Sequence, residues 1–126
     1  MYPGTDLIEI NRVSKALSRT PKLKMRLFTT MEIVQCEQKG NPLESFAGRF
    51  AAKEAVLKAL GTGLRGLNWV DIEVVNNDLG RPEVRLYGAA LELARQLGIY
   101  EIKISISHSR DLAVAFALAL TREGRM

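Results

Sequence analysis

The stretch that most constrains the fold is the run Leu112–Thr121, in which large apolar residues alternate with alanine. A strand has a side-chain period of two, so the large residues share one face and the alanines share the other. Both faces are therefore apolar, and such a strand needs cover on both sides. We expect the large side chains to fill a core, and the alanine face to let a helix or another subunit approach closely.

Length and composition favour a single domain over residues 1–126. The chain has 47% hydrophobic and 25% charged residues, which is typical of a globular protein that buries a core without disulfides. Cys36 is the only cysteine, which favours a reducing compartment and a cytoplasmic location. The longest apolar run has nine residues, far fewer than the roughly 20 that span a bilayer, and the N-terminus does not resemble a signal peptide.

Caps and turn residues divide the rest of the chain into short elements. A strand is expected at residues 6–10, followed by a helix that Asn11 caps and Thr20-Pro21 ends. Thr29 and Glu32 form a capping-box pattern that starts a helix running to about Gln38. The further expected elements are a helix at 43–60, hairpin strands at 71–75 and 83–86, a helix at 89–97 and a strand at 102–106. This order predicts an α+β fold with a mainly antiparallel sheet.

The helix expected at 43–60, which Gly61 ends, carries charges that a packing helix does not need. Lys53 falls within an apolar stripe, where a lysine can lay its stem on the surface and extend its ammonium group into solvent. Glu54 and Lys58 share the next stripe, where such a pair is usually a surface brace worth about 0.2–0.5 kcal/mol. A binding role is the alternative, because small alanines beside Glu54 leave room for a ligand.

A glycine-rich turn supports the binding alternative. Gly61-Thr62-Gly63 follows Lys58 within one turn, and exposed amides of such a turn can hold phosphate oxygens. The pattern alone is weak, since the chain has no Walker loop.

Two motifs together resemble a known family. Gly4-Thr5-Asp6 near the N-terminus and the run FAAKEAVLK at 50–58 are similar to the paired motifs of 4′-phosphopantetheinyl transferases. The small bacterial type, the holo-acyl-carrier-protein synthases, is most similar, and the resemblance covers nearly the whole chain. It implies the fold of that family and a homotrimer with coenzyme A at the subunit interfaces.

The resemblance also implies a reaction of fatty acid biosynthesis. The phosphopantetheine arm of coenzyme A moves to a serine of an apo acyl carrier protein, which releases adenosine 3′,5′-bisphosphate. Asp6 and Glu54 match the acids that bind Mg²⁺, and Lys58 would stabilise charge on the leaving group. The residues expected at coenzyme A are Arg49, Lys58, Gly61, Thr62, Gly63, His108 and Ser109. The base that deprotonates the serine stays open between a water or hydroxide held by the metal and direct proton removal by Asp6 or Glu54.

A basic segment suggests an anionic partner. Residues 11–31 carry six lysines and arginines and no acid, whereas the whole chain has a net charge of +4. An acidic carrier protein suits Arg12, Lys15 and Arg19, which share one helix stripe, and Arg26 can join them. A nucleic-acid module is the main rival, but the eight aromatic residues do not cluster with the basic ones. An inactive interaction protein is the second rival.

The start of the chain departs from the family pattern. Tyr2-Pro3 replaces part of the strand that usually precedes the aspartate, and proline cannot donate to a sheet. We therefore expect a short or frayed first strand with Asp6 less firmly held, or a start codon that lies upstream.

Overall fold

The structure is a computed structural model that describes residues 1–122. Its helices and strands, in chain order, are β1 (Tyr2–Glu9), α1 (Ile10–Arg19), α2 (Leu23–Leu27), α3 (Thr30–Glu37), α4 (Pro42–Leu60), the short 3-10 helix η1 (Trp69–Asp71), β2 (Ile72–Asn76), β3 (Pro82–Leu86), α5 (Gly88–Gln96), β4 (Ile99–His108) and β5 (Leu112–Thr121). The three strands β1, β5 and β4 form one antiparallel sheet, and β2 and β3 form a separate hairpin. The expected α+β class is confirmed.

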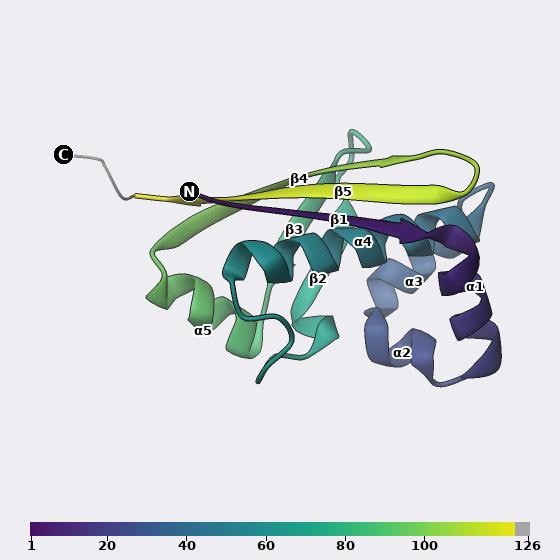
Figure 1. The fold of residues 1–126 in the computed structure, drawn as a ribbon, viewed down its shortest axis with the longest axis horizontal. Helices are drawn as coiled ribbons and strands as arrows, with labels where there is room; N and C mark the ends of the chain where they lie inside the picture. Colours follow the sequence, from purple (N-terminus) through teal and green to yellow (C-terminus); the bar gives the residue numbers. More distant parts are fainter. Residues whose placement is uncertain (123–126) are drawn as a thin grey trace.

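The sheet and α4 form the centre of the molecule. In Figure 1 the sheet lies along one side of α4, α1 to α3 gather at one end, and α5 lies at the other. The main core lies between α4, the sheet, the hairpin and α5. In the described residues no helix is long and apolar enough to cross a membrane.

The first strand is longer than expected. β1 pairs with β5 over its whole length, from Tyr2 opposite Ala119 to Glu9 opposite Leu112. Pro3 fits because β1 lies at the edge of the sheet, where a missing N–H need not break a ladder. The expectation of a short or frayed strand is therefore wrong, and Asp6 lies within the paired region, opposite Ala115.

The two faces of β5 are used differently from the expectation. The alanines at 113, 115, 117 and 119 are buried against α4, so close approach of a helix to this face is confirmed. The large residues do not fill the core of the chain. Leu112 and Val114 are exposed and Phe116 is 50% exposed, on the outer face of the sheet. The alternating pattern correctly predicted two apolar faces. The face with the large side chains, however, points away from the core and not into it as expected.

Small residues bring α4 against the sheet. Gly4 of β1 lies so close to α4 that an added Cβ would overlap the carbonyl oxygen of Ala55 and lie 2.7 Å from the amide nitrogen of Ala59. Gly48 faces Ile106 of β4 in the same way, with 3.0 Å left for a Cβ. This contact places the middle of α4 beside β1.

The ends of the helices follow local rules, with two differences from the sequence prediction. Asn41 caps α4 and Gly61 ends it in the left-handed conformation, with a φ of 80°. The capping box of Thr29 and Glu32 is present at α3. The cap of α1 is Glu9 rather than Asn11, and the short helix α2 was not predicted.

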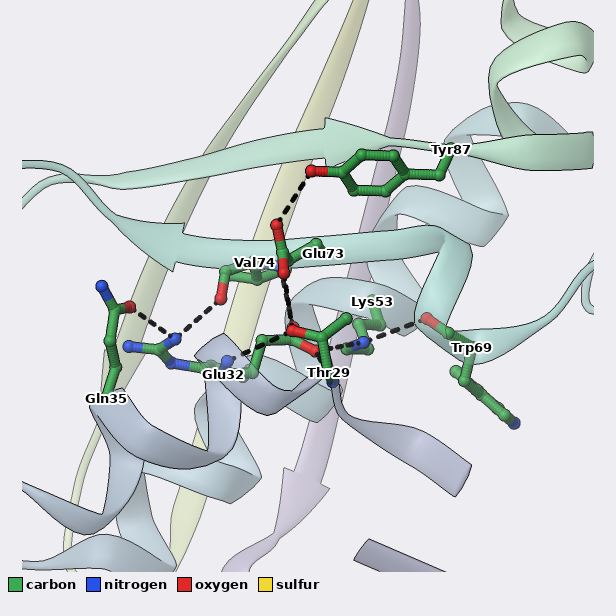
Figure 2. Close-up of polar contacts among 9 residues, drawn as sticks. Thr29, Glu32, Gln35, Lys53, Trp69, Glu73, Val74 and Tyr87 are labelled. Carbon is green, nitrogen blue, oxygen red and sulfur yellow. Dashed lines mark hydrogen bonds and ion pairs between the residues drawn. The ribbon is translucent and has the colours of Figure 1, made fainter. Parts of the chain in front are cut away.

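Side chains of α3 and α4 cover the open edge of the hairpin (Figure 2). Glu32 accepts a hydrogen bond from the amide of Val74 at 2.8 Å, and Arg49 donates to the carbonyl of Val74 at 2.7 Å. Gln35 bonds both the amide and the carbonyl of Asn76, at 2.9 and 3.2 Å. These side chains supply the hydrogen bonds that a third strand would give to β2.

Candidate active site

An ion pair joins the N-terminal strand to α4. The ammonium nitrogen of Lys58 lies 3.0 Å from Oδ1 of Asp6, and it donates a second hydrogen bond of 3.0 Å to the carbonyl of Thr5. Asp6 projects from β1 where Gly4 lets α4 approach, so the helix can present its charged stripe to the strand. The structure thus brings together two expected site residues that lie 52 positions apart.

Glu54 lies one turn before Lys58 on α4, and it shares this environment with Asp6. Its pKa is raised, first by burial and then by the negative charge of Asp6, while Lys58 lowers it in part. The expected surface brace between Glu54 and Lys58 is absent, because Lys58 pairs with Asp6 instead. Two carboxylates therefore line one groove, and one ammonium group pairs with the carboxylate of Asp6.

The donor set of this region fits a hard divalent cation. Two carboxylates whose charges repel each other gain from a shared cation, and Mg²⁺ often takes one or two carboxylates and fills its other positions with phosphate oxygens and water. Among the described residues no group of three or more His, Cys, Asp or Glu side chains could hold a metal. A cation at Asp6 and Glu54 would therefore take its other ligands from water or from a substrate.

A groove of about 470 Å³ opens beside the two carboxylates. It lies between β1, α1, α2 and α4, and both Asp6 and Glu54 line it together with Arg12. Its apolar lining includes Leu17, Leu23, Leu27 and Phe50. The groove gives an amphipathic partner a path from the basic helix α1 to the carboxylates.

The basic residues expected to bind a partner lie near this groove. Arg12, Lys15 and Arg19 are exposed on α1, and Arg26 is exposed on α2. Only Arg12 of these four lines the groove itself.

The glycine turn after α4 is exposed. Gly61 and Gly63 have φ values of 80° and 59°, which side chains rarely adopt, so the sequence of this turn requires glycine. Thr62 donates to the carbonyl of Gly63 at 3.0 Å. The turn begins three residues after Lys58, so its backbone lies at the end of the helix that carries the charged site.

His108 lies near the other end of α4 from Glu54 of the same chain. Its Nδ1 lies 3.8 Å from a carboxylate oxygen of Glu44, at the start of α4. Glu44 and Glu54 are ten residues apart on one helix, which corresponds to about 15 Å at 1.5 Å per residue. Ser109 follows in the β4–β5 turn, where its hydroxyl accepts a hydrogen bond of 3.3 Å from the amide of Leu112.

Arg49 does not lie at the surface. It is only 4% exposed, and its guanidinium group is bonded to Gln35 at 2.9 Å and to Val74 at 2.7 Å. A group held in this way covers the edge of β2 and is not presented to a phosphate in solution. The expected role of Arg49 at coenzyme A stays a prediction, and in this structure its guanidinium group is bonded within the chain.

Lys53 does not extend into solvent, so the surface interpretation of this residue is wrong. Its side chain is 0% exposed, and its ammonium nitrogen lies 2.8 Å from Glu32 and 3.0 Å from the carbonyl of Trp69 (Figure 2). Sequence reasoning missed this partner. A lysine within an apolar stripe does signal a buried acid, but nothing in the spacing identifies Glu32 as that acid.

Comparison with known proteins identifies the family of this chain. The model of the 4′-phosphopantetheinyl transferase superfamily matches residues 2–117. The holo-[acyl-carrier-protein] synthase of Caldanaerobacter subterraneus subsp. tengcongensis is 46% identical over 98% of this chain and 97% of that protein.

Solved structures agree with the sequence comparison. The holo-[acyl-carrier-protein] synthase of Neisseria meningitidis superimposes with a TM-score of 0.85 at 34% identity, over 95% of this chain and 98% of that one. The Helicobacter pylori synthase in complex with coenzyme A gives a TM-score of 0.82 at 32% identity, over 94% and 99% of the two chains.

Proposed function

The chain belongs to the 4′-phosphopantetheinyl transferase superfamily, and we propose that it is a holo-acyl-carrier-protein synthase. It transfers the 4′-phosphopantetheine arm of coenzyme A to a serine of apo acyl carrier protein, and adenosine 3′,5′-bisphosphate leaves. The observation that carries this conclusion is that Asp6 and Glu54 line one groove and Lys58 pairs with Asp6, in a chain 46% identical to a synthase of this name.

The chemistry requires positioning and neutralisation of charge. The serine oxygen forms a bond to the phosphorus that carries the pantetheine arm, and the bond from that phosphorus to the bridging pyrophosphate oxygen breaks. Negative charge grows on the departing bisphosphate, where the ammonium group of Lys58 stabilises it. The serine proton passes to a carboxylate. We favour Glu54, because its pKa is raised and no hydrogen bond occupies it in the described part of the chain.

Asp6 and Glu54 also form the site we propose for Mg²⁺. When bound, this ion would neutralise the pyrophosphate of coenzyme A and hold it against α4. Burial raises the pKa of Glu54 most, and the negative charge of Asp6 raises it further. This second effect supports the assignment, because a cation bound by both carboxylates would offset their repulsion.

We propose that coenzyme A runs from this site toward the glycine turn. Gly61, Thr62 and Gly63 follow Lys58 at the end of α4 and leave backbone groups exposed for a phosphate. His108 and Ser109 remain candidates for the same ligand. Because His108 lies beside Glu44, about 15 Å along α4 from Glu54, these two residues fit best if they serve the site of a neighbouring copy.

The outer face of the sheet supports assembly, which we propose to be a homotrimer. Val114 and Phe116 lie on this exposed face, where β1 adds Leu7, which is 63% exposed. A contiguous apolar face on a sheet usually marks an interface. A trimer that buries it would bring His108 of one copy toward the carboxylates of another.

The carrier protein is proposed to dock on α1. Arg12 joins the groove that holds Asp6 and Glu54, and Lys15 and Arg19 extend the basic stripe along the exposed side of the helix. An acidic helical partner gains from this charge, and apolar side chains can enter the groove. We place the reaction in the cytoplasm, since the buried thiol of Cys36 suits a reducing compartment.

Product analysis tests the reaction. The chain is incubated with coenzyme A, MgCl₂ and apo acyl carrier protein, and adenosine 3′,5′-bisphosphate is measured by chromatography. We expect one bisphosphate per carrier molecule and none with a carrier in which alanine replaces the acceptor serine. Equal release with both carriers would indicate hydrolysis of coenzyme A and would overturn the transfer.

A further inference from the structure

The buried lysine next to the proposed catalytic glutamate has a fixed set of partners. The ammonium group of Lys53 donates to the carbonyl of Trp69 at 3.0 Å, lies 2.8 Å from Glu32, and sits 5.4 Å from the centre of the Phe28 ring. Burial lowers the pKa of Lys53, and the negative charge of Glu32 opposes this change. Lys53 thus ties α4 to α3 and to the loop before β2.

Glu32 is itself held in place. One of its carboxylate oxygens accepts from the amide of Thr29 at 2.7 Å, and the other accepts from the amide of Val74 at 2.8 Å (Figure 2). Two backbone groups from different elements therefore fix this carboxylate, and the lysine that meets it can occupy one position only. The neighbouring carboxylate of Glu73 is bonded to Thr29 and Tyr87 and is not free to replace it.

Glu54 has no such anchor of its own. Within residues 1–122 its carboxylate makes no hydrogen bond or ion pair, and it feels Asp6 and Lys58 only through their charges. Its position is therefore set by the rotation of the helix that carries it. The apolar side chains that α4 buries, such as Phe46 and Val56, also restrain the helix, but their contacts lack the direction that a hydrogen bond imposes.

We propose that Lys53 is a positioning residue, whose buried contacts with Glu32 and Trp69 fix the rotation of α4 and so hold Glu54 opposite Asp6. The inference rests on the proposed function, which gives Glu54 its role. A helix with side chains has a radius of about 5–6 Å, so a rotation of about 10° moves a carboxylate by about 1 Å. An error of 1 Å in a catalytic group can cost about 100-fold in rate.

A double-mutant cycle separates this role from simple stability. The transfer rate at saturating coenzyme A and carrier is measured for wild type, Lys53→Met, Glu54→Gln and the double variant, each shown by circular dichroism to be folded at the assay temperature. We expect Lys53→Met to lower kcat by about 10- to 100-fold in wild type and by less than about twofold when Glu54 is already replaced. An equal factor in both backgrounds would overturn the proposal.

Arg49→Met provides the matched control. It also removes a buried cation of α4 that is bonded to β2, but Arg49 lies more than one turn from Glu54. Its effect on kcat should be the same factor with and without Glu54. If Lys53→Met does not fold, Glu32→Gln removes the charged partner of the lysine without a change in the sequence of α4, and the same cycle decides the proposal.

A binding measurement gives a second readout. Electron paramagnetic resonance measures the affinity for Mn²⁺ in the absence of coenzyme A. We expect Lys53→Met to lower this affinity. The double variant should bind Mn²⁺ no more weakly than Glu54→Gln alone. Unchanged affinity in Lys53→Met would count against the proposal. A wild-type rate in Glu54→Gln alone would instead overturn the role given to Glu54, and this inference with it.

Discussion

Nζ of Lys58 lies 3.0 Å from Oδ1 of Asp6, so the ion pair of the site joins the edge strand of the sheet to the central helix. The lysine is 54% exposed and the aspartate 14% exposed, which makes the pair accessible from solvent. A pair with this exposure contributes less than about 1 kcal/mol to stability. We therefore expect its value to the protein to lie in the reaction more than in the fold.

Replacement of this lysine should separate activity from stability. We expect Lys58→Ala to lower the transfer rate by about 100-fold or more, because the departing phosphate loses its cation. The free energy of unfolding, measured with urea, should change by less than about 1 kcal/mol. A large loss of stability with activity retained would show that the pair is structural.

Replacement of Glu54 should change the pH dependence of stability. Burial and the charge of Asp6 raise the pKa of Glu54 above its ordinary value of 4.5, so the folded chain holds this proton more tightly than the unfolded chain. The stability that this proton provides is complete below pH 4.5 and is lost as the pH rises through the raised pKa. The variant Glu54→Gln has no ionisable group at this position, so its free energy of unfolding should not fall in this way as the pH rises.

Urea unfolding in the presence of a chelator measures the effect. We expect Glu54→Gln to be more stable than wild type at pH 7, with the difference closing as the pH falls toward 4.5. The variant should nevertheless be nearly inactive. A variant that is less stable at pH 7 would mean that the ionised Glu54 has a stabilising partner.

The contact at Gly4 should tolerate no side chain. In Gly4→Ala the new methyl group would overlap the carbonyl oxygen of Ala55, which belongs to helix backbone and cannot move aside cheaply. We expect a loss of at least about 1–3 kcal/mol in the free energy of unfolding. Gly40→Ala is the control, because nothing lies within 4 Å of an added Cβ there. Equal effects at the two glycines would argue against the close approach of β1 and α4.

Charge reversal on α1 should affect one substrate only. We expect Arg12→Glu to raise KM for the carrier protein by about tenfold or more, and to make this KM less dependent on salt concentration. KM for coenzyme A should be unchanged. Lys39→Glu makes the same change of charge at an exposed position outside the groove and should have little effect. An equal loss for carrier and coenzyme A would place Arg12 at the nucleotide.

Mixing two inactive variants tests a site shared between copies. Lys58→Ala and His108→Ala are dissociated, mixed in equal amounts and allowed to reassemble. In a homotrimer with shared sites, about a quarter of the sites would combine an intact Lys58 with an intact His108 from another copy. Activity near a quarter of wild type is therefore expected. No recovery, in a mixture shown by mass spectrometry to contain mixed trimers, would place both residues in one chain.

Local rules predicted the helices and strands well. The cap at Thr29, the stop at Gly61 and the turn between β2 and β3 all follow from a few neighbouring residues. The faces of β5 did not follow, because alternation says nothing about which side α4 occupies. That choice depends on Gly4 and on the alanines of α4, which lie far away in the sequence.

The site itself was predicted mainly through resemblance. Spacing cannot pair Asp6 with Lys58 across 52 positions, and only the family pattern linked them before the structure did. The same limit explains Lys53, whose partner Glu32 is recognisable from the sequence only as a helix cap. Arg49 was assigned to coenzyme A because it lies near the motif, and this stays a prediction, whereas the contacts that the structure shows for it are with Gln35 and Val74.

The transfer itself can be measured on the carrier protein. Apo acyl carrier protein is incubated with coenzyme A, MgCl₂ and the chain, and its intact mass is recorded. We predict a gain of about 340 Da, the mass of one phosphopantetheine arm, which forms far more slowly with folded Glu54→Gln or Lys58→Ala. No gain with any of several apo carriers, by a protein that is folded and supplied with the metal, would contradict the assignment.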